Sequence, residues 1–370
     1  MLGGLDVASA QFNFQLHKFR AIAIFMVVFF HMLFQQELIQ QSSVNAVAIN
    51  FIKALIGCPT LLFVFVSGFL LQHLNYSKYL SSNSFWPWYL MFMKGKLLKI
   101  YLPMLIVSCL ILCLSQLLLL LPNGNSFFWY IDFSWMSRDP ATFIMQLLLG
   151  HVQPSYWYLP FIIVVMAIVP LVFVRNQFLL IPLFILTFIS AYFVHRNAFF
   201  YYLSGVEGFL HMFLYHIPFF YFGMIFCKYE KYFQCLIESR FLIILLVYIS
   251  LIFLFIWDMN LPFMSGDFIL LLLGFCQVFI IYHSIGNSKT CSFLLDALAK
   301  NSFLIYFLHL FLGVNLIRCI AKILHLNGQS CWIALIIGFI VTSFVSVLLI
   351  ILGNQLRKFL GIRARYLFGA

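Results

Sequence analysis

Long apolar runs separated by short polar segments recur along the whole chain. Runs such as 241–257 and 332–352 are apolar on every face, whereas strands of a membrane barrel alternate apolar and polar residues over segments of about ten residues. A helix satisfies its own backbone in hydrocarbon, and about 20 apolar residues cross the bilayer. The pattern predicts an all-α integral membrane protein, a bundle of about ten transmembrane helices. The expected spans are 19–36, 50–72, 97–121, 156–174, 178–195, 206–226, 241–257, 266–285, 301–320 and 331–353.

Composition supports this interpretation, because 64% of residues are hydrophobic, 8% are charged and the mean hydropathy is +1.05. The formal net charge of +11 comes from short basic groups between apolar runs, so it does not indicate a nucleic-acid partner. The nine cysteines include no C-x-x-C pair and lie mostly in apolar runs, where they act as small hydrophobic residues. We expect no metal site.

The basic residues also predict the orientation of the chain. With the N-terminus in the cytoplasm, 16 of the 21 lysines and arginines fall on the inner side. Because cytoplasmic loops carry the excess of positive charge, both termini are expected in the cytoplasm. The outer side keeps Lys53, Arg138, Arg196, Arg318 and Lys322.

The longest connection between spans, 122–155, begins with a turn sequence and continues into an aromatic cluster. A short helix is expected at 141–149. Such a segment is typical of an outer cap lying on the membrane. The whole chain, 1–370, is expected to form one transmembrane domain. With 17 residues after Gly353, no fused periplasmic domain is expected.

The first span places an arginine and a histidine on one helical face. Arg20 and His31 are eleven residues apart, which is about 20° beyond three full turns and about 16 Å along the axis. An ionisable residue inside a span is expensive, so by default it faces a polar cavity and marks a functional site. The alternative is a hydrogen-bonded structural histidine with an arginine that reaches to the interface.

A second basic group opens the third span. Lys96 and Lys99 are three residues apart and therefore project from the same side of a helix. Beside Arg20 they would form a cationic cluster suited to the phosphates of a nucleotide-containing donor. Positive-inside anchoring and lipid contact explain the same residues without a ligand.

Other polar residues inside spans are weaker candidates. Ser67 precedes a glycine in the second span, but it lacks the flanking glycines and the strand of a hydrolase elbow, so helix packing explains it better. In the ninth span Tyr306 and His309 share one side and could line the cavity. Alternatively, Tyr306 is an aromatic residue at the membrane interface and His309 makes a buried polar contact. Further cavity candidates are Trp157, near the outer mouth, and Glu207 with His211, four apart in the sixth span.

Taken together, these segments resemble the membrane-bound acyltransferase family 3. That family has an arginine and a histidine separated by ten residues in its first span, a phenylalanine-rich Ser-Gly-Phe second span, a tryptophan segment after a long outer loop and a late Tyr-x-x-His element. The matching positions, in family order, are Arg20 with His31, 63–70, 157–159, and Tyr306 with His309. One departure is that Lys96 and Lys99 stand where the family commonly has R-x-x-R. Lysine keeps the charge but loses the bidentate fork.

The resemblance implies a membrane O-acyltransferase in the bacterial inner membrane. Its donor would be a cytoplasmic acyl-CoA, usually acetyl-CoA, and its acceptor a hydroxyl of a cell-surface or lipid-linked glycan such as the lipopolysaccharide O-antigen. Arg20, Lys96 and Lys99 would hold the CoA phosphates. His31 would then act as the general base or carry the acyl group covalently, and Tyr306 or Ser67 would stabilise the oxyanion.

Two rival functions use the same residue types. In a transporter or flippase of lipid-linked glycans, buried histidines and arginines would form a substrate or proton pathway. However, no paired pattern of broken helices indicates the inverted repeats common in transporters. A glycan polymerase would favour large basic outer loops, and the largest loop here carries only Arg138. The sequence therefore favours the enzyme.

Overall fold

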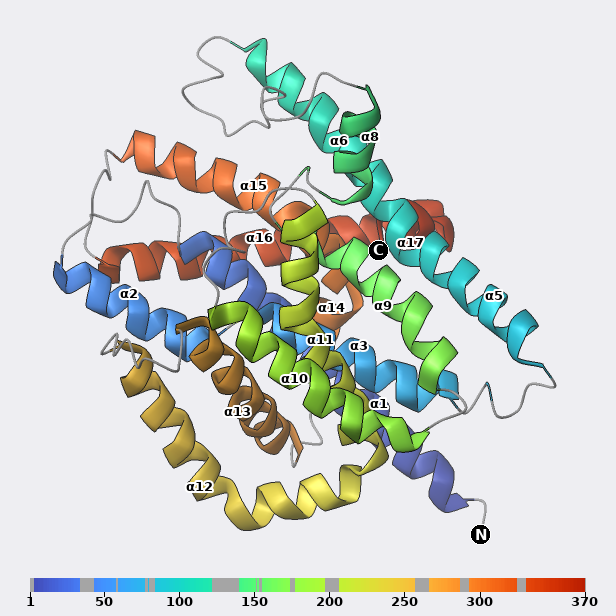
Figure 1. Ribbon diagram of the computed structural model, residues 1–370. Helices are drawn as coiled ribbons and strands as arrows, with labels where there is room; N and C mark the ends of the chain where they lie inside the picture. Colours follow the sequence, from blue (N-terminus) through green and yellow to red (C-terminus); the bar gives the residue numbers. More distant parts are fainter. Residues whose placement is uncertain are drawn as a thin grey trace. The chain divides into compact units, whose positions relative to one another are not determined.

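The computed structural model describes residues 3–33, 43–57, 59–76, 79, 84–121, 140–150, 152, 155–173, 177–196, 206–256, 266–286, 293–324 and 331–369. Within these ranges the chain is helical and has no strand (Figure 1). Among the labelled elements, η2 and η3 are π-helical and η5 is a 3-10 helix. The elements in chain order are α1 (Gly3–Leu33), α2 (Ser43–Ile56), α3 (Pro59–Leu70), η2 (Leu71–Asn75), α5 (Phe85–Lys96), η3 (Leu97–Tyr101), α6 (Leu102–Leu119), α8 (Pro140–Leu148), α9 (Tyr158–Phe173), η5 (Gln177–Leu179), α10 (Leu180–Arg196), α11 (Val206–Lys228), α12 (Glu230–Ile256), α13 (Gly266–Gly286), α14 (Phe293–Lys300), α15 (Ser302–Ile323), α16 (Cys331–Leu360) and α17 (Arg363–Phe368).

Seven helical stretches of the described chain are long and apolar enough to cross a membrane. Three shorter apolar helices, Tyr158–Leu171, Gln177–Phe193 and Met212–Lys228, fall where further spans are expected. The all-α membrane class is therefore confirmed, while the count of ten and the orientation of the termini stay predictions. The seven stretches are Gln15–Leu33, Asn50–Leu74, Phe85–Ser115, Glu230–Ile256, Phe268–Ile285, Ser302–Ile323 and Trp332–Leu360.

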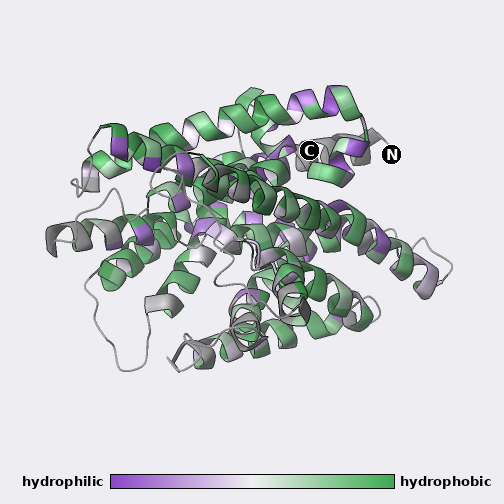
Figure 2. Cartoon of the chain, turned by 90° about the horizontal axis from the view of Figure 1, so that it is seen from above, coloured by the Kyte–Doolittle hydropathy of each residue, from purple (hydrophilic) through white to green (hydrophobic). Residues whose placement is uncertain are grey.

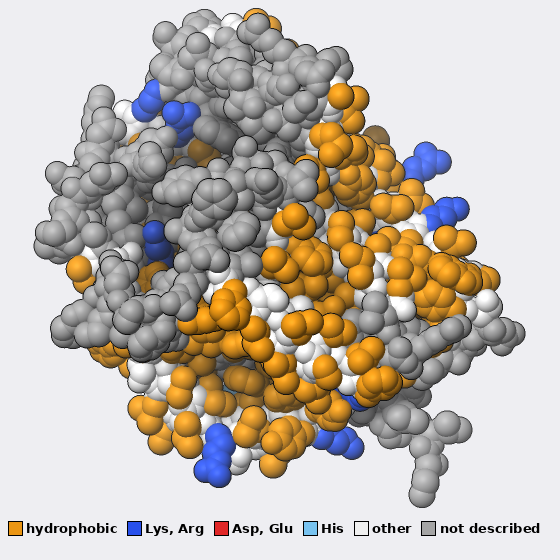
Figure 3. All heavy atoms as spheres, viewed as in Figure 1, with side chains coloured by type: hydrophobic (Ala, Val, Ile, Leu, Met, Phe, Trp, Pro, Cys, Tyr) orange, Lys and Arg blue, Asp and Glu red, His pale blue; other side chains and the backbone are white. Residues whose placement is uncertain are grey.

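Apolar side chains cover the outside of these helices as well as their packed faces. On α12, Leu242 is 68% exposed and Phe253 62% exposed. The ribbon is hydrophobic along most helices in Figure 2, and hydrophobic side chains cover much of the face seen in Figure 3, where the visible lysines and arginines are few. Water would penalise such a surface and hydrocarbon would not, which is why a membrane is the expected solvent.

The chain divides into two compact units by contacts. The first takes 1–23, 50–90 and 165–299, and the second takes 24–49, 91–164 and 300–370. Each unit is made of three stretches that are separate in the sequence. The two units therefore describe how the helices pack and are not successive domains along the chain. The expectation of a single domain stays a prediction.

In the first unit, α3 and α11 cross at two glycines. A Cβ on Gly68 would collide with the backbone carbonyl of Phe220, and one on Gly223 would collide with that of Phe65. Small residues let helix backbones approach closely where hydrocarbon offers no hydrophobic drive for association. The crossing therefore explains why position 68 is a glycine, while the role of Ser67 stays a prediction.

In the second unit, one long helical stretch changes its winding near a proline. α5 runs into η3, where the Leu102 N–H donates to the Leu97 carbonyl, and then into α6. Pro103 has no N–H and would clash with a normal i−4 carbonyl, and a π-type turn is one way a helix accommodates this. Lys99 lies in this wide turn.

Candidate active site

Arg20 and His31 lie on the buried side of α1, which is one uninterrupted α-helix through both positions. Their neighbours one turn away are Ala23 and Ile24 for Arg20, and Val27 and Val28 for His31. Those four side chains are between 0% and 1% exposed. The arginine and the histidine are themselves partly buried. The shared face that the sequence predicts therefore points into protein and not towards lipid.

The ring of His31 lies beside that of His309 on α15. The ring centroids are 5.3 Å apart with an angle of 43° between the planes. His309 is 0% exposed. Gly313, one turn further along α15, helps to make room for this contact between α1 and α15. The Met32 side chain fills the place that a Cβ on residue 313 would occupy. Both histidines belong to the second unit.

The hydrogen bonds of His309 identify its tautomer. Its Nδ1 lies 3.1 Å from the Ile305 carbonyl oxygen and 2.9 Å from that of Tyr306. A carbonyl oxygen can only accept, so Nδ1 carries the hydrogen and donates it. Nε2 then holds a lone pair. It is buried and has no hydrogen-bond partner among the described residues.

Tyr306 and Tyr156 form a reciprocal clamp between α15 and the turn that precedes α9. The Tyr306 hydroxyl donates to the Ser155 carbonyl, and the Tyr156 hydroxyl donates to the Phe307 carbonyl. Ser155 is 4% exposed and Tyr156 is 0% exposed. The expected helix of the outer cap exists as α8. Ser155, at the end of the expected cap, is buried in the second unit, and the two hydroxyls join its turn to α15. The position of the cap relative to the membrane stays a prediction.

The clamp brings the tryptophan segment to the histidine pair. Tyr158 packs its ring 5.7 Å from the ring of Tyr306, and the ring of Tyr306 is 6.0 Å from that of His309. Trp157 lies between Tyr156 and Tyr158 in the chain and packs against Phe161. The structure therefore groups four predicted residues in one unit. They are His31, Trp157, Tyr306 and His309.

The role expected for Tyr306 is restricted by this geometry. A phenol donates one hydrogen, and that of Tyr306 is given to the Ser155 carbonyl. Stabilising an oxyanion would require this bond to break. The sequence does not show which backbone carbonyl a tyrosine hydroxyl will reach. Ser155 and Tyr156 could therefore not be predicted as part of the site. The position of Tyr156 next to Trp157 is the one available hint.

Lys96 and Lys99 lie in the second unit, at the end of α5 and in η3. Lys96 Nζ is 5.2 Å from the centroid of the Phe92 ring, and both lysines are partly buried. The short helix α17 packs against η3 and α6 and carries the exposed Arg363 and Arg365. In the sequence these arginines are two of the 16 basic residues that predict the orientation of the chain. A basic segment after the last span was the signal that pointed to them.

Other predicted residues lie in the first unit or outside the described side chains. Arg20 and the partly buried Ser67 belong to the first unit, so their expected grouping with the second-unit residues stays a prediction. Glu207 and His211 fall on α11, but their side chains lie outside the described residues. Within the described part of the chain, no group of three His, Cys, Asp or Glu side chains could hold a metal ion.

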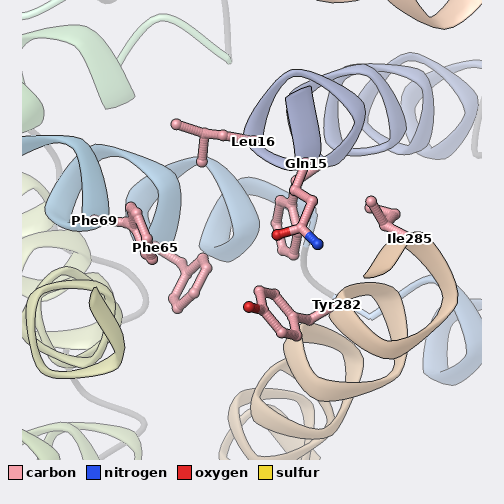
Figure 4. A pocket seen from close by; sticks show the side chains of 7 residues that line it. Gln15, Leu16, Phe65, Phe69, Tyr282 and Ile285 are labelled. Carbon is pink, nitrogen blue, oxygen red and sulfur yellow. The ribbon is translucent and has the colours of Figure 1, made fainter. Parts of the chain in front are cut away.

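A small apolar pocket of the first unit lies beside the part of α1 that contains residues 15–19 (Figure 4). Gln15, Leu16 and Phe19 line it from α1. The Tyr282 hydroxyl at its edge donates to Glu230 Oε1 at 2.9 Å. With no charged lining residue, the pocket fits an apolar chain better than a phosphate. Phe65, Phe69 and Ile285 complete the lining.

A family model described as an acyltransferase domain matches residues 14–351, nearly the whole chain. The match includes both histidines of the pair, the clamp and both lysines. No curated protein and no solved structure matches the chain.

Proposed function

The chain belongs to acyltransferase family 3, and from this premise we propose that it is an O-acyltransferase of the bacterial inner membrane. It moves an acyl group, most simply acetyl, from cytoplasmic acyl-CoA to a hydroxyl of a cell-surface or lipid-linked glycan such as the lipopolysaccharide O-antigen. One observation carries the proposal. An imidazole inside a membrane span lies on a buried helix face against a second imidazole.

His31 is the general base of this reaction. A neutral imidazole has one basic ring nitrogen, so it can take a proton and return it within one turnover. Its basic nitrogen removes the acceptor hydroxyl proton while the oxygen attacks the thioester carbonyl. The new C–O bond forms, the C–S bond breaks, and the CoA thiolate leaves and takes the proton from His31.

Cationic side chains support the binding of acyl-CoA as the donor. In this proposal Lys96 and Lys99 bind the donor phosphates as point charges. The guanidinium group of Arg20, on α1, adds a bidentate hydrogen bond to phosphate. The neighbouring Arg363 and Arg365 of α17 extend the charge at the inner side of η3. Several cations near one site raise the local concentration of a polyanionic donor.

The buried turn at 155–157 supports an acceptor path from the outer side. Its backbone is held on α15 one turn from His309, and Trp157 follows directly. Aromatic side chains next to a polar group suit the apolar faces and hydroxyls of a sugar.

Mass spectrometry of surface glycan tests the function. Glycan from cells that carry the protein should be heavier by one acyl group per modified sugar than glycan from cells that lack it. Feeding isotope-labelled acetate should shift that difference by the mass of the label. Identical acyl content with altered amount or length of glycan would refute acyl transfer and favour a transporter or a polymerase.

A further inference from the structure

The Nε2 atom of His309 is a buried acceptor that the reaction above does not use. The carbonyls of Ile305 and Tyr306 hold the hydrogen on Nδ1, so the lone pair on Nε2 is fixed in place. Among the described residues that atom has no hydrogen-bond partner. A buried acceptor of this kind normally has a hydrogen-bond partner, so the unsatisfied Nε2 atom needs a functional explanation.

His31 lies where a partner for this atom would be. The 5.3 Å between the two ring centroids brings facing ring nitrogens within reach of an N–H···N hydrogen bond of about 3 Å. The two rings are tilted by 43°, so the bond needs a rotation of a ring and no displacement of a helix. Helix packing at Met32 and Gly313 holds the two backbones at this spacing.

We propose that His309 is a positioning residue for His31, an inference that rests on the proposed function. Its Nε2 accepts the N–H of the His31 ring, which fixes the tautomer of His31 and leaves the other nitrogen basic and turned towards the acceptor hydroxyl. When His31 becomes an imidazolium, the same lone pair stabilises the added charge. The third group of a catalytic triad plays the same part by orienting its histidine.

The proton balance of the step is unchanged by His309. The acceptor hydroxyl gives its proton to the free nitrogen of His31, and the leaving thiolate receives that proton. His309 keeps its own hydrogen on Nδ1 throughout, because both carbonyls remain in place. Its contribution is orientation and charge stabilisation, so its loss should lower turnover more than it changes donor binding.

Two substitutions separate the Nε2 atom from the backbone bond. His309→Asn keeps a donor near the position of Nδ1 and removes Nε2. Asn315 on the same helix shows that this is feasible, because its amide donates to the Phe311 carbonyl one turn back at 2.8 Å. His309→Gln instead places an amide near the position of Nε2 and gives up the backbone bond.

A matched control lies in the first unit. His216 on α11 is 2% exposed and has its Nδ1 2.8 Å from the Met212 carbonyl, which is the same back-bond as that of His309. His216→Asn therefore tests what the replacement of a buried histidine does by itself.

The experiment measures acyl transfer and the reactivity of His31 in purified full-length protein in nanodiscs. We expect His309→Asn to lower kcat about tenfold with the KM for acetyl-CoA unchanged, a smaller loss than the roughly 10²–10⁴-fold contribution of the general base itself. His309→Gln should recover part of this loss, and His216→Asn should keep the wild-type kcat. Diethyl pyrocarbonate should modify His31 several-fold more slowly in His309→Asn, as read by peptide mass spectrometry.

Equal kcat and equal His31 modification in wild type and His309→Asn would overturn the inference, as would equal losses in the Asn and Gln variants. If the wild type transfers no acyl group to any glycan, the proposed function fails. The modification rate of His31 then still decides whether the two histidines are coupled.

Discussion

Removal of the Tyr306 hydroxyl tests whether the clamp on the 155–157 turn holds the candidate site together. Tyr306→Phe leaves the buried Ser155 carbonyl without the donor that it has in the wild type. A buried polar group that loses its partner costs about 1–3 kcal/mol, so this variant should lose that much free energy of unfolding. Tyr156→Phe should lose less, about 1 kcal/mol, because the Phe307 carbonyl lies inside α15 and keeps its helical N–H donor. Because both bonds fix the same turn, the double variant should lose less than the sum, with a coupling of about 0.5–3 kcal/mol.

Unfolding in mixed micelles on titration with SDS, followed by tryptophan fluorescence, measures these free energies. Tyr232→Phe is the control, since Tyr232 is 67% exposed, and exposed substitutions usually stay within about 0.5 kcal/mol of wild type. In the same proteins the KM for the glycan acceptor should rise while that for acetyl-CoA stays constant. Single variants as stable as Tyr232→Phe would refute the clamp, and strictly additive losses would refute its cooperativity.

Further predictions concern packing and donor binding. Gly68→Ala should destabilise the protein by about 1–3 kcal/mol, because its Cβ meets the Phe220 carbonyl; Gly95→Ala, which meets open space, should be neutral, and equal melting of the two would contradict the tight crossing. Lys99→Gln should raise the KM for acetyl-CoA about fivefold, the effect of roughly 1 kcal/mol at a partly screened site, with kcat constant and with Lys99→Arg restoring the wild-type value. Arg20→Ala should raise the same KM, and an unchanged KM in initial-rate assays would remove these cations from the donor site.

Hydropathy located the helices but not their ends. The apolar run at 97–121 belongs to a helical stretch that begins at Phe85, and the run at 241–257 belongs to α12, which begins at Glu230. A helix continues past the edge of the hydrocarbon as long as its residues favour it, so an apolar window finds only the part inside. The break at Gly57, where φ is +66°, likewise divides a run that hydropathy treats as one span.

Helical periodicity predicts which residues of one helix lie on the same face. Arg20 shares a face with His31, and Tyr306 shares one with His309, because spacing along a regular helix determines direction. The contact between the two histidines and the bonds of Tyr306 join parts of the chain that are far apart in sequence. Such contacts depend on how helices pack, so the tautomer of His309 could not be predicted from residue spacing. Asn301, directly before α15, likewise makes a distant contact, since its side chain accepts a hydrogen bond from Arg357 and does not cap the helix.

The proposed reaction depends on the imidazole of His31 as its general base. The most direct measurement is transfer of isotope-labelled acetyl from acetyl-CoA to glycan by equal amounts of purified wild-type and His31→Ala protein, with His283→Ala as a matched histidine from α13. We predict labelled glycan with wild type and His283→Ala, and none above background with a folded His31→Ala. Labelled glycan at the wild-type rate from His31→Ala would contradict the account.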